Sequence, residues 1–308
     1  MTDPETISDA TIATPYRCGT AALVGRPNVG KSTLLNALIG WRLSIVSPKP
    51  QTTRHRILGV LTNPSAQIMF LDTPGLHKPK SRAINRQLNK AARQTIAEAD
   101  VIVQVIETGR WNSEDQAVYD AIALQERPRL LVLNKIDAQK DKKLLLPFIA
   151  DVNSRCAFDD IYLVSAQRKD GLDDLAEAIR KRLPEAPAAF GADEITDRSE
   201  RFLASELVRE QLMRHLSQEL PYSTTVEIDE FREGTGRAEV NATIWVEREG
   251  QKAIVIGEGG AMLKIIGTAA RKAMMRLFDR RVHLQLWVKV RENWSDDEGD
   301  LRRFGYAE

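Results

Sequence analysis

Residues 25–32 form a glycine-rich run that ends in a lysine and a serine. The run fits the pattern G-x-x-x-x-G-K-[ST], in which the glycines let successive backbone N–H groups converge on phosphate oxygens. In this pattern Lys31 places a positive charge beside the β- and γ-phosphates, and the Ser32 hydroxyl binds Mg²⁺. A glycine-rich turn can match the pattern by chance, so the surrounding sequence must decide. The predicted phosphate-binding residues are Gly25, Arg26, Pro27, Asn28, Val29, Gly30, Lys31, Ser32 and Thr33.

Residues 44–56 are polar, contain two prolines and lack the spacing of a helix or a strand, which predicts a loop. Its adjacent threonines, Thr52 and Thr53, stand where a nucleotide-dependent switch would offer a hydroxyl to Mg²⁺. A plain surface loop explains the same composition, so the segment is ambiguous when taken alone. The candidate residues of this first switch are Gln51, Thr52, Thr53, Arg54 and His55.

A D-x-x-G motif begins at Asp72, directly after a buried strand predicted at 67–71. At a strand end the motif puts a carboxylate near the metal and a glycine N–H where a γ-phosphate can hold it. The motif is weak alone, but it becomes informative about 40 residues after Lys31. The candidate residues of this second switch are Asp72, Thr73, Pro74, Gly75 and Leu76. The predicted Mg²⁺ ligands are Ser32, Thr53 and Asp72.

The N-K-x-D segment at 134–137 is the most specific signal in the chain. The Asp137 carboxylate can accept from both N1–H and the 2-amino group of guanine, a pair that adenine lacks. The alternative explanation of this motif is a pair of residues that caps a helix. In a nucleotide-dependent kinase or an ATPase, the motif would have no role in recognition of the base. Ser165 and Ala166 follow the strand predicted at 161–164, and a loop of this type could place a backbone N–H near the guanine O6. The predicted guanine-binding residues are Asn134, Lys135, Asp137, Ser165 and Ala166.

These motifs follow apolar segments that alternate with segments of helical spacing. The predicted strands are 20–24, 56–61, 67–71, 101–106, 130–133 and 161–164. The predicted helices are 34–39, 81–98, 113–124 with Ser113 as its N-cap, and 170–183. Such alternation predicts a mostly parallel sheet with helices on both faces, in which ligands bind at the carboxyl ends of the strands.

With 308 residues, the chain is long enough for two domains with separate cores. The formal net charge is +1, so any surface for a polyanion must be local. Two cysteines, Cys18 and Cys156, argue against a disulfide scaffold, and no apolar run approaches the roughly 20 residues of a membrane span. The acidic N-terminus fits neither a secretory signal nor a transit peptide. We therefore expect a cytoplasmic protein whose residues 1–17 are disordered.

A stretch rich in proline, alanine and acidic residues at 184–196 indicates a domain boundary. Beyond it the pattern predicts a helix from Asp197 as N-cap to about Leu216 and a hairpin of strands at 224–231 and 237–246. An apolar run, a glycine-rich loop, a long helix and a last strand follow at 252–256, 257–260, 261–278 and 282–290. The predicted units are a first domain at 18–184, a linker at 185–197, a second domain at 198–291 and a tail at 292–308.

The nucleotide motifs, in this order and spacing, resemble the Ras-like P-loop GTPases related to translation factors. The resemblance implies hydrolysis of GTP to GDP and phosphate, slow without a helper and dependent on Mg²⁺. Many small GTPases carry a water-orienting glutamine directly after D-x-x-G, whereas this chain has Leu76 and resembles a hydrophobic-substituted subgroup. In related GTPases an asparagine at the place of Asn28 helps to hold K⁺. We therefore expect hydrolysis that is stimulated by K⁺.

The second predicted domain resembles a type II KH domain, a smaller α+β fold. In that fold I-G-x-x-G clamps a single-stranded nucleic-acid backbone beside a groove for about four nucleotides. This loop departs from many others because Glu258 stands between its glycines and should repel phosphate. Backbone N–H groups and nearby basic side chains would then have to hold the RNA. The predicted RNA-binding residues are Ile256, Gly257, Glu258, Gly259, Gly260, Lys252, Lys264 and Arg271.

Together with Q-T-T-R-H at 51–55 and H-L-Q-L-W-V-K-V at 283–290, the two predicted domains closely resemble the Era family over about residues 18–307. The resemblance implies binding to the 3′ end of 16S ribosomal RNA, assistance of 30S ribosomal subunit assembly and maturation, and peripheral association with the inner face of the bacterial cell membrane. None of these follows from the residues alone, and we expect a monomer. The alternative is a membrane-associated or tRNA-modification-linked regulatory GTPase whose KH-like domain is structural. The tail at 295–305 also resembles the Era family, but its residues suggest no physical role.

Overall fold

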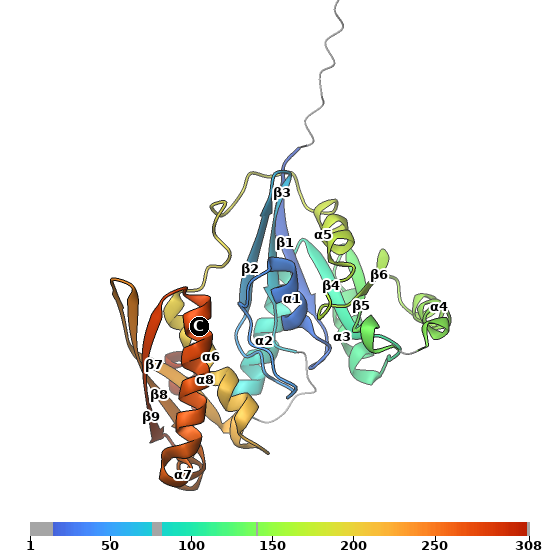
Figure 1. The fold of residues 1–308 in the computed structure, drawn as a ribbon. Helices are drawn as coiled ribbons and strands as arrows, with labels where there is room; N and C mark the ends of the chain where they lie inside the picture. Colours follow the sequence, from blue (N-terminus) through green and yellow to red (C-terminus); the bar gives the residue numbers. More distant parts are fainter. Residues whose placement is uncertain (1–14, 76–81, 140, 307–308) are drawn as a thin grey trace, which may run out of the picture.

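The computed structural model describes residues 15–75, 82–139 and 141–306, which form two domains (Figure 1). In the first domain these residues build one sheet of six strands in the order β2-β3-β1-β4-β5-β6. Only β2 and β3 pair antiparallel, and the other neighbouring strands are parallel. The strands are β1 (Arg17–Val24), β2 (Ile57–Asn63), β3 (Ala66–Asp72), β4 (Val101–Glu107), β5 (Arg129–Asn134) and β6 (Asp160–Val164).

Helices cover both faces of this sheet. Along β1, Ala21 and Leu23 pack into a core with α1 and α5, whereas Ala22 and Val24 pack into a second core with α2 and α3. This alternation follows from the two-residue period of a strand, and it confirms the predicted α/β fold. The helices are α1 (Lys31–Ile39), α2 (Ala83–Glu98), α3 (Ser113–Ala123), α4 (Leu145–Arg155) and α5 (Leu172–Arg180).

The second domain packs three helices on one face of a three-stranded sheet. Strands β7 and β8 form an antiparallel hairpin, and β9 lies parallel to β8 at the edge. Val255, Ile266 and Ala270 bring the helices into one core with the inner side chains of the strands. The elements are α6 (Glu200–His215), β7 (Thr224–Gly234), β8 (Arg237–Val246), α7 (Glu249–Ile256), α8 (Ala261–Leu277) and β9 (Arg281–Val290). The order confirms the predicted KH fold.

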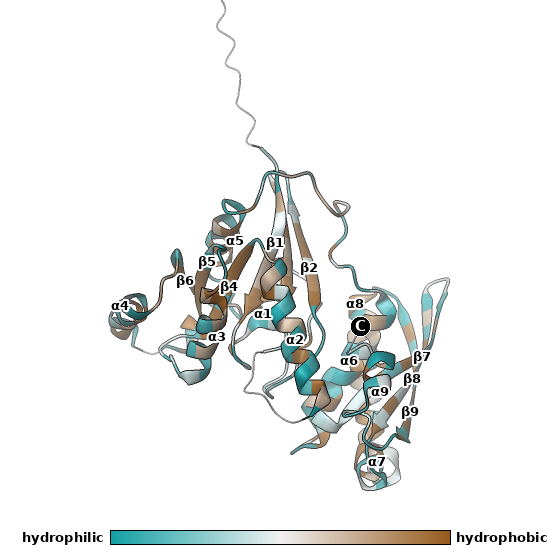
Figure 2. Cartoon of the chain, turned by 180° about the vertical axis from the view of Figure 1, so that it is seen from behind, coloured by the Kyte–Doolittle hydropathy of each residue, from teal (hydrophilic) through white to brown (hydrophobic). Residues whose placement is uncertain are grey.

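The segment after β9 joins the two domains. It contains the short helix α9 (Glu298–Arg303) and returns to pack against the first domain. Its Trp294, Leu301 and Tyr306 form a buried apolar cluster with Ile84 and Leu88 of α2. Figure 2 shows α9 on the second domain, close to the end of α2. This packing gives the tail a structural role that its sequence did not suggest.

The predicted linker is fixed to the first domain. The Gln67 amide nitrogen donates to the Phe190 carbonyl at 2.9 Å, and the Gln67 amide oxygen accepts from the backbone N–H of Ala189 at 2.8 Å. The Val60 N–H donates to the Ile195 carbonyl at 2.9 Å. The extended link in Figure 1 therefore runs along β2 and β3.

Several predicted element boundaries are wrong. Asn112 rather than Ser113 caps α3, and Ser199 rather than Asp197 caps α6, because the oxygens of these side chains accept the first free helix N–H groups. The helix predicted at 170–183 is shorter, since α5 begins only after Gly171 in a left-handed conformation.

Helix α4 was not predicted. Val152 is its one fully buried residue, and Leu146 is 77% exposed, so its apolar residues do not mark a single inner face. No single helix within the described residues is both long and apolar enough to span a membrane. By length and composition alone, α7 and the segment Glu258–Leu277 meet that test as a pair bent by 44°.

Candidate nucleotide site and nucleic-acid-binding loop

The phosphate-binding loop lies between β1 and α1, at the carboxyl end of the sheet. Gly30 has φ 100°, and a Cβ built there would lie 2.3 Å from the Asn134 amide nitrogen. A Cβ on Gly25 would lie 2.3 Å from the Val105 carbonyl oxygen. Helix α1 starts at Lys31 without a side-chain cap and without an acidic residue in its first turn. Its N–H groups therefore remain available to an anion, as phosphate binding requires.

Lys31 is buried at the centre of this loop. Its ammonium group donates to the carbonyl oxygens of Gly25 at 2.9 Å and Arg26 at 3.1 Å. Burial lowers the pKa of Lys31 to about 8, although the nearby Asp72 carboxylate opposes this effect. A buried ammonium with few negative neighbours is a suitable partner for phosphate oxygens.

The three predicted metal ligands meet at one point. The Ser32 hydroxyl lies 2.6 Å from Asp72 Oδ2 and 2.8 Å from the Thr53 hydroxyl. Asp72 is fully buried, and its Oδ1 lacks a hydrogen-bond partner within the described residues. Burial raises the pKa of Asp72, against the opposing effects of Lys31 and the hydroxyl groups. Two hydroxyls and an unpartnered carboxylate oxygen are hard oxygen donors, so these residues fit Mg²⁺.

Sequence reasoning missed one member of this cluster. The Ser44 hydroxyl donates to Asp72 Oδ2 at 2.8 Å and is buried. Ser44 is the first residue of the predicted loop at 44–56, and its hydroxyl helps to orient the Asp72 carboxylate. Several hydroxyl residues share that loop, and no spacing rule singles out this one.

The guanine-specificity residues also lie together. Asp137 Oδ1 accepts from the Ser165 hydroxyl at 2.5 Å. The loop that contains Ser165 and Ala166 therefore orients the carboxylate that should recognise the base. Lys135 has φ 64°, and its ammonium group lies 3.6 Å from Glu107 Oε1.

Asn134 has a structural task that the sequence did not reveal. Its amide nitrogen donates to the Val29 carbonyl at 2.8 Å, and its amide oxygen accepts from the Ala166 N–H at 3.1 Å. Asn134 is buried and thus ties the phosphate-binding loop to the loop at Ser165 and Ala166. Base contacts by Asn134 and by the Ala166 N–H remain predictions.

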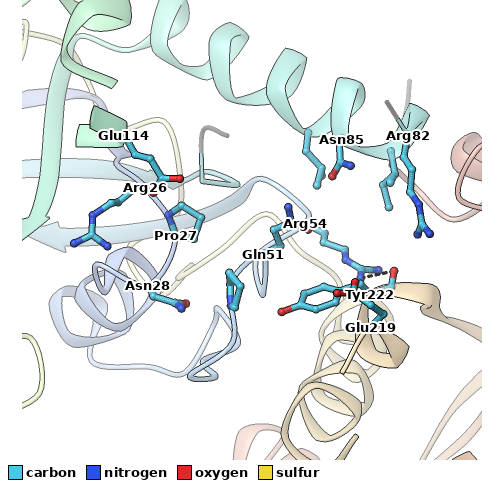
Figure 3. A pocket seen from close by; sticks show the side chains of 13 residues that line it. Arg26, Pro27, Asn28, Gln51, Arg54, Arg82, Asn85, Glu114, Glu219 and Tyr222 are labelled. Atoms are coloured by element: carbon cyan, nitrogen blue, oxygen red, sulfur yellow. Dashed lines mark hydrogen bonds between the residues drawn. The ribbon is translucent and has the colours of Figure 1, made fainter. Parts of the chain in front are cut away.

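A cavity of about 440 Å³ is lined by the phosphate-binding loop, the first switch, Gly75 and Lys135. Its lining includes Lys31, Ser32 and Thr53, which are predicted to bind the phosphates and Mg²⁺, whereas Asn134 and Asp137 do not line it. A larger neighbouring cavity of about 770 Å³ lies between the first switch, α2 and residues 219–222 of the second domain (Figure 3). The larger one shares Pro27, Asn28 and Gln51 with the nucleotide cavity but does not include the metal ligands.

The two switch segments contact the phosphate-binding loop. The Asn28 amide nitrogen donates to the Pro48 carbonyl at 3.0 Å, which joins that loop to the first switch. The Thr73 hydroxyl donates to the Leu23 carbonyl at 3.0 Å. A Cβ on Gly75 would lie 3.0 Å from the Pro27 nitrogen, so the start of the second switch packs closely on the loop. Leu76, the predicted departure from other GTPases, lies outside the described residues.

The glycine-rich loop of the second domain lies between α7 and α8. Gly257, Gly259 and Gly260 have φ values of 74°, 56° and 81°, which turn the chain sharply at the start of α8. Glu258 is exposed at the tip.

The basic residues around this loop are not equivalent. Lys264 and Arg271 are exposed on α8, whereas the Lys252 ammonium group lies 3.5 Å from the Glu249 carboxylate. Ile256 packs partly against the core, and its contact with RNA remains a prediction.

Sequence reasoning missed two exposed apolar residues near the loop. Ile254 on α7 is 59% exposed, and Ile265 on α8 is 48% exposed. They lie on the helices that come directly before and after the loop.

The two domains each match a protein family. The family described as "50S ribosome-binding GTPase" matches residues 20–135, and the family described as "KH domain" matches residues 219–295. Proteins named GTPase Era are similar over nearly the whole chain. The one from Stenotrophomonas maltophilia is 55% identical over 293 residues, which cover 95% of this chain and 98% of that protein. The one from Xanthomonas oryzae is 55% identical over 294 residues, which cover 96% and 98%.

Two solved structures resemble the whole chain. A single-residue variant of Aquifex aeolicus Era bound to GDP·AlF4⁻ aligns with a TM-score of 0.91 and 40% identity. Era in complex with MgGDPNP and nucleotides 1506–1542 of 16S ribosomal RNA aligns with a TM-score of 0.91 and 41% identity. Each alignment covers 95% of this chain and 100% of the solved chain, so the arrangement of the two domains is also similar.

Proposed function

This chain belongs to the Era family of GTPases, and we propose that it binds the 3′ end of 16S ribosomal RNA under the control of GTP and so assists the assembly and maturation of the 30S subunit. The single observation that supports this role best is the likeness to the Era complex with 16S nucleotides, which extends over both domains. The exposed glycine-rich loop supplies the matching chemistry, because its backbone can approach a phosphodiester closely.

The enzyme hydrolyses GTP with Mg²⁺ as cofactor. Mg²⁺, when bound, neutralises charge that develops on the β- and γ-phosphates. Ser32, Thr53 and Asp72 would hold the ion, and Ser44 keeps the Asp72 carboxylate oriented. Lys31 and the uncapped start of α1 bind the phosphates through fixed donors, which cost no reorganisation during the reaction.

Potassium is the second ion that we assign to the site. Asn28 adopts a left-handed conformation in the phosphate-binding loop, and its amide nitrogen is held by the first switch. That contact would keep the amide oxygen of Asn28 in a fixed position as a ligand for K⁺. The cation would then add positive charge where other GTPases use an arginine from a partner.

RNA binding would combine the loop backbone with two kinds of neighbouring side chain. Lys264 and Arg271 would attract phosphates, while Ile254 and Ile265 would support bases. Glu258 opposes this attraction, so the substitution Glu258→Lys should tighten RNA binding and make it more sensitive to salt.

Paired substitutions in the loop test the RNA-binding role. A Cβ added at Gly259 or Gly260 meets nothing within 4 Å, so Gly259→Asp with Gly260→Asp adds two negative charges without a steric clash, at the cost of backbone strain from the positive φ values of both residues. The matched control is Gly236→Asp, which has a similar φ of 72° and equally open space in the hairpin turn. We expect the pair to lower affinity for a 16S 3′-end oligonucleotide at least tenfold and the control to leave it unchanged. Equal affinity in the pair and the wild type would make the KH domain structural, as in the alternative reading.

We place the protein in the bacterial cytoplasm as a monomer, with peripheral association at the inner face of the cell membrane. Fractionation of cells tests the location, and light scattering of the purified chain tests the monomer. Recovery of the protein only in the cytosolic fraction, with none in the membrane fraction, would exclude the proposed membrane association.

A further inference from the structure

We propose that the KH domain and the C-terminal segment position Thr53, the metal-binding threonine of the first switch, through Arg54, His55 and Tyr306. This inference rests on the assignment of Thr53 as an Mg²⁺ ligand. It adds a task for the second domain that is independent of RNA, namely to complete the nucleotide site.

Arg54 directly follows Thr53 and leaves the first domain. Its guanidinium donates to the carbonyl oxygens of Thr224 at 2.9 Å, Tyr222 at 3.0 Å and Pro221 at 3.2 Å. Figure 3 shows the side chain reaching from the first switch to the segment with Tyr222. Arg54 is 4% exposed, and burial lowers its pKa. A buried guanidinium must keep its hydrogen bonds, so these three carbonyls fix the backbone beside Thr53.

His55, the next residue, contacts the C-terminal segment. Its ring stacks on Tyr306 with centroids 4.6 Å apart and an interplanar angle of 15°. It also meets the edge of Phe202 on α6 at 5.1 Å. The Tyr306 hydroxyl lies 2.9 Å from the Thr225 hydroxyl on β7, so the stacked ring is itself held by the KH sheet.

A buried ion pair between Arg209 and Glu206 lies next to His55. Arg209 donates from Nε and Nη2 to the two oxygens of Glu206 at 2.7 and 2.6 Å. The His55 Nδ1 lies 3.4 Å from Glu206 Oε1. Burial alone would raise the pKa of Glu206, but Arg209 and His55 outweigh burial and hold that pKa well below its ordinary value. The negative carboxylate therefore stays close to the imidazole, although the His55 Nδ1 makes no hydrogen bond among the described residues and both Glu206 oxygens accept from Arg209.

The same C-terminal segment contacts the element that follows the second switch. Asp296 Oδ1 accepts from the Ala83 N–H at 2.8 Å, and the Ser295 carbonyl accepts from the Ile84 N–H at 3.1 Å. The start of α2 and the end of the first switch thus share one support. Loss of that support should free Thr53 from the position 2.8 Å from Ser32.

The effect should depend on the nucleotide. In GTPases the γ-phosphate and Mg²⁺ order the switch segments, and hydrolysis releases them. A weaker support for Thr53 should therefore reduce affinity for the triphosphate and leave affinity for GDP unchanged. A general structural defect would instead reduce both affinities.

The test compares Tyr306→Ala with Tyr306→Phe in the full chain, with Mg²⁺ and either GDPNP or GDP. Loss of an aromatic pair predicts roughly two- to tenfold weaker GDPNP binding for Tyr306→Ala, with GDP binding unchanged. Tyr306→Phe keeps the ring stack and should bind GDPNP almost as the wild type does. Arg303→Ala is the matched control, because Arg303 belongs to the same segment but pairs with Glu227 on the KH sheet.

Arg54→Lys keeps the charge and removes the fork that reaches three carbonyls, so it should repeat the selective loss of GDPNP binding. Equal GDPNP binding in Tyr306→Ala and the wild type, or an equal loss for GDP, would overturn the proposal. Thermal unfolding of each variant separates an unfolded protein from a selective defect. The experiment contains no RNA, so its result is independent of the ribosomal assignment.

Discussion

The hydroxyl oxygens of Ser32 and Thr53 lie 2.8 Å apart, one at the start of α1 and the other in the first switch. Both lie beside Asp72, whose second oxygen is buried and has no hydrogen-bond partner among the described residues, as a cation ligand requires. Because Arg54 binds the KH domain directly after Thr53, the metal site lies beside one of the contacts between the two domains. Nucleotide chemistry and RNA binding can be coupled through this short path.

Asp72→Asn should reduce the kcat of GTP hydrolysis by about 10²-fold or more, because it removes the carboxylate from the assigned metal ligands. Half-saturation with Mg²⁺ should move to higher concentration. Ser44→Ala is the control, since it removes one hydrogen bond to Asp72 and leaves the ligands in place. Unchanged Mg²⁺ dependence in Asp72→Asn would contradict the assignment.

Asp137→Asn should weaken GTP binding by about 10²-fold, because the amide keeps one acceptor oxygen but loses the second acceptor and the negative charge, and its NH₂ faces a donor of guanine. An amide also presents a donor, which suits a base with a carbonyl at position 2. Xanthosine triphosphate should therefore bind the variant better than GTP does. Competition with a fluorescent guanine nucleotide measures both affinities, and a variant that still prefers GTP would refute the role of Asp137.

Nucleotide binding should take up a proton at alkaline pH. The pKa of Lys31 is lowered from 10.5 to about 8, so the free folded protein holds this group neutral where the unfolded chain holds it charged. The cost of burying the charged Lys31 lowers stability below pH about 8, and this cost is relieved as pH rises from about 8 to 10.5. Bound phosphates favour the charged form, so nucleotide affinity should fall as pH rises above about 8.

Calorimetry near pH 9 in buffers of different ionisation enthalpy measures this uptake. We expect about one proton at most per nucleotide. The uptake should vanish in Lys31→Met, which binds nucleotide more weakly. Identical binding enthalpies in all buffers for the wild type would show that Lys31 stays charged in the free protein.

Hydrolysis should be faster in K⁺ than in Na⁺ at equal ionic strength. Asn28→Ala should remove the difference between the two ions, because it deletes the amide that we propose as a ligand for the cation and that contacts Pro48. Turnover in matched KCl and NaCl buffers measures the effect. Equal turnover of the wild type in both salts would exclude this role for potassium.

Much of the nucleotide site could be predicted from local sequence. Ser32, Asp72 and Asp137 follow predicted strands in short motifs, and parallel strands bring their carboxyl ends to one edge of the sheet. In the structure the Ser32 hydroxyl lies 2.6 Å from Asp72 Oδ2, and the Ser165 hydroxyl donates a hydrogen bond to Asp137. The spacing of motifs could also predict the KH loop, because its glycines fall between two helical patterns.

Contacts between distant segments were not predictable. Tyr306 and His55 lie far apart in the sequence, and no periodicity connects them. Glu206 and Arg209 look like solvent-facing positions on α6, yet both are buried because the first switch covers that side of the helix. Asn134 had a plausible task at the base, which concealed its role in joining two loops.

If GTP controls RNA binding, the affinity of the full chain for a labelled 16S 3′-end oligonucleotide must depend on the bound nucleotide. Fluorescence anisotropy with Mg²⁺ compares saturating GDPNP with saturating GDP. Coupling between two sites predicts at least about fivefold tighter RNA binding with GDPNP, and by reciprocity the same factor in GDPNP affinity when RNA is present. Equal RNA affinity with both nucleotides would show that GTP does not control RNA binding.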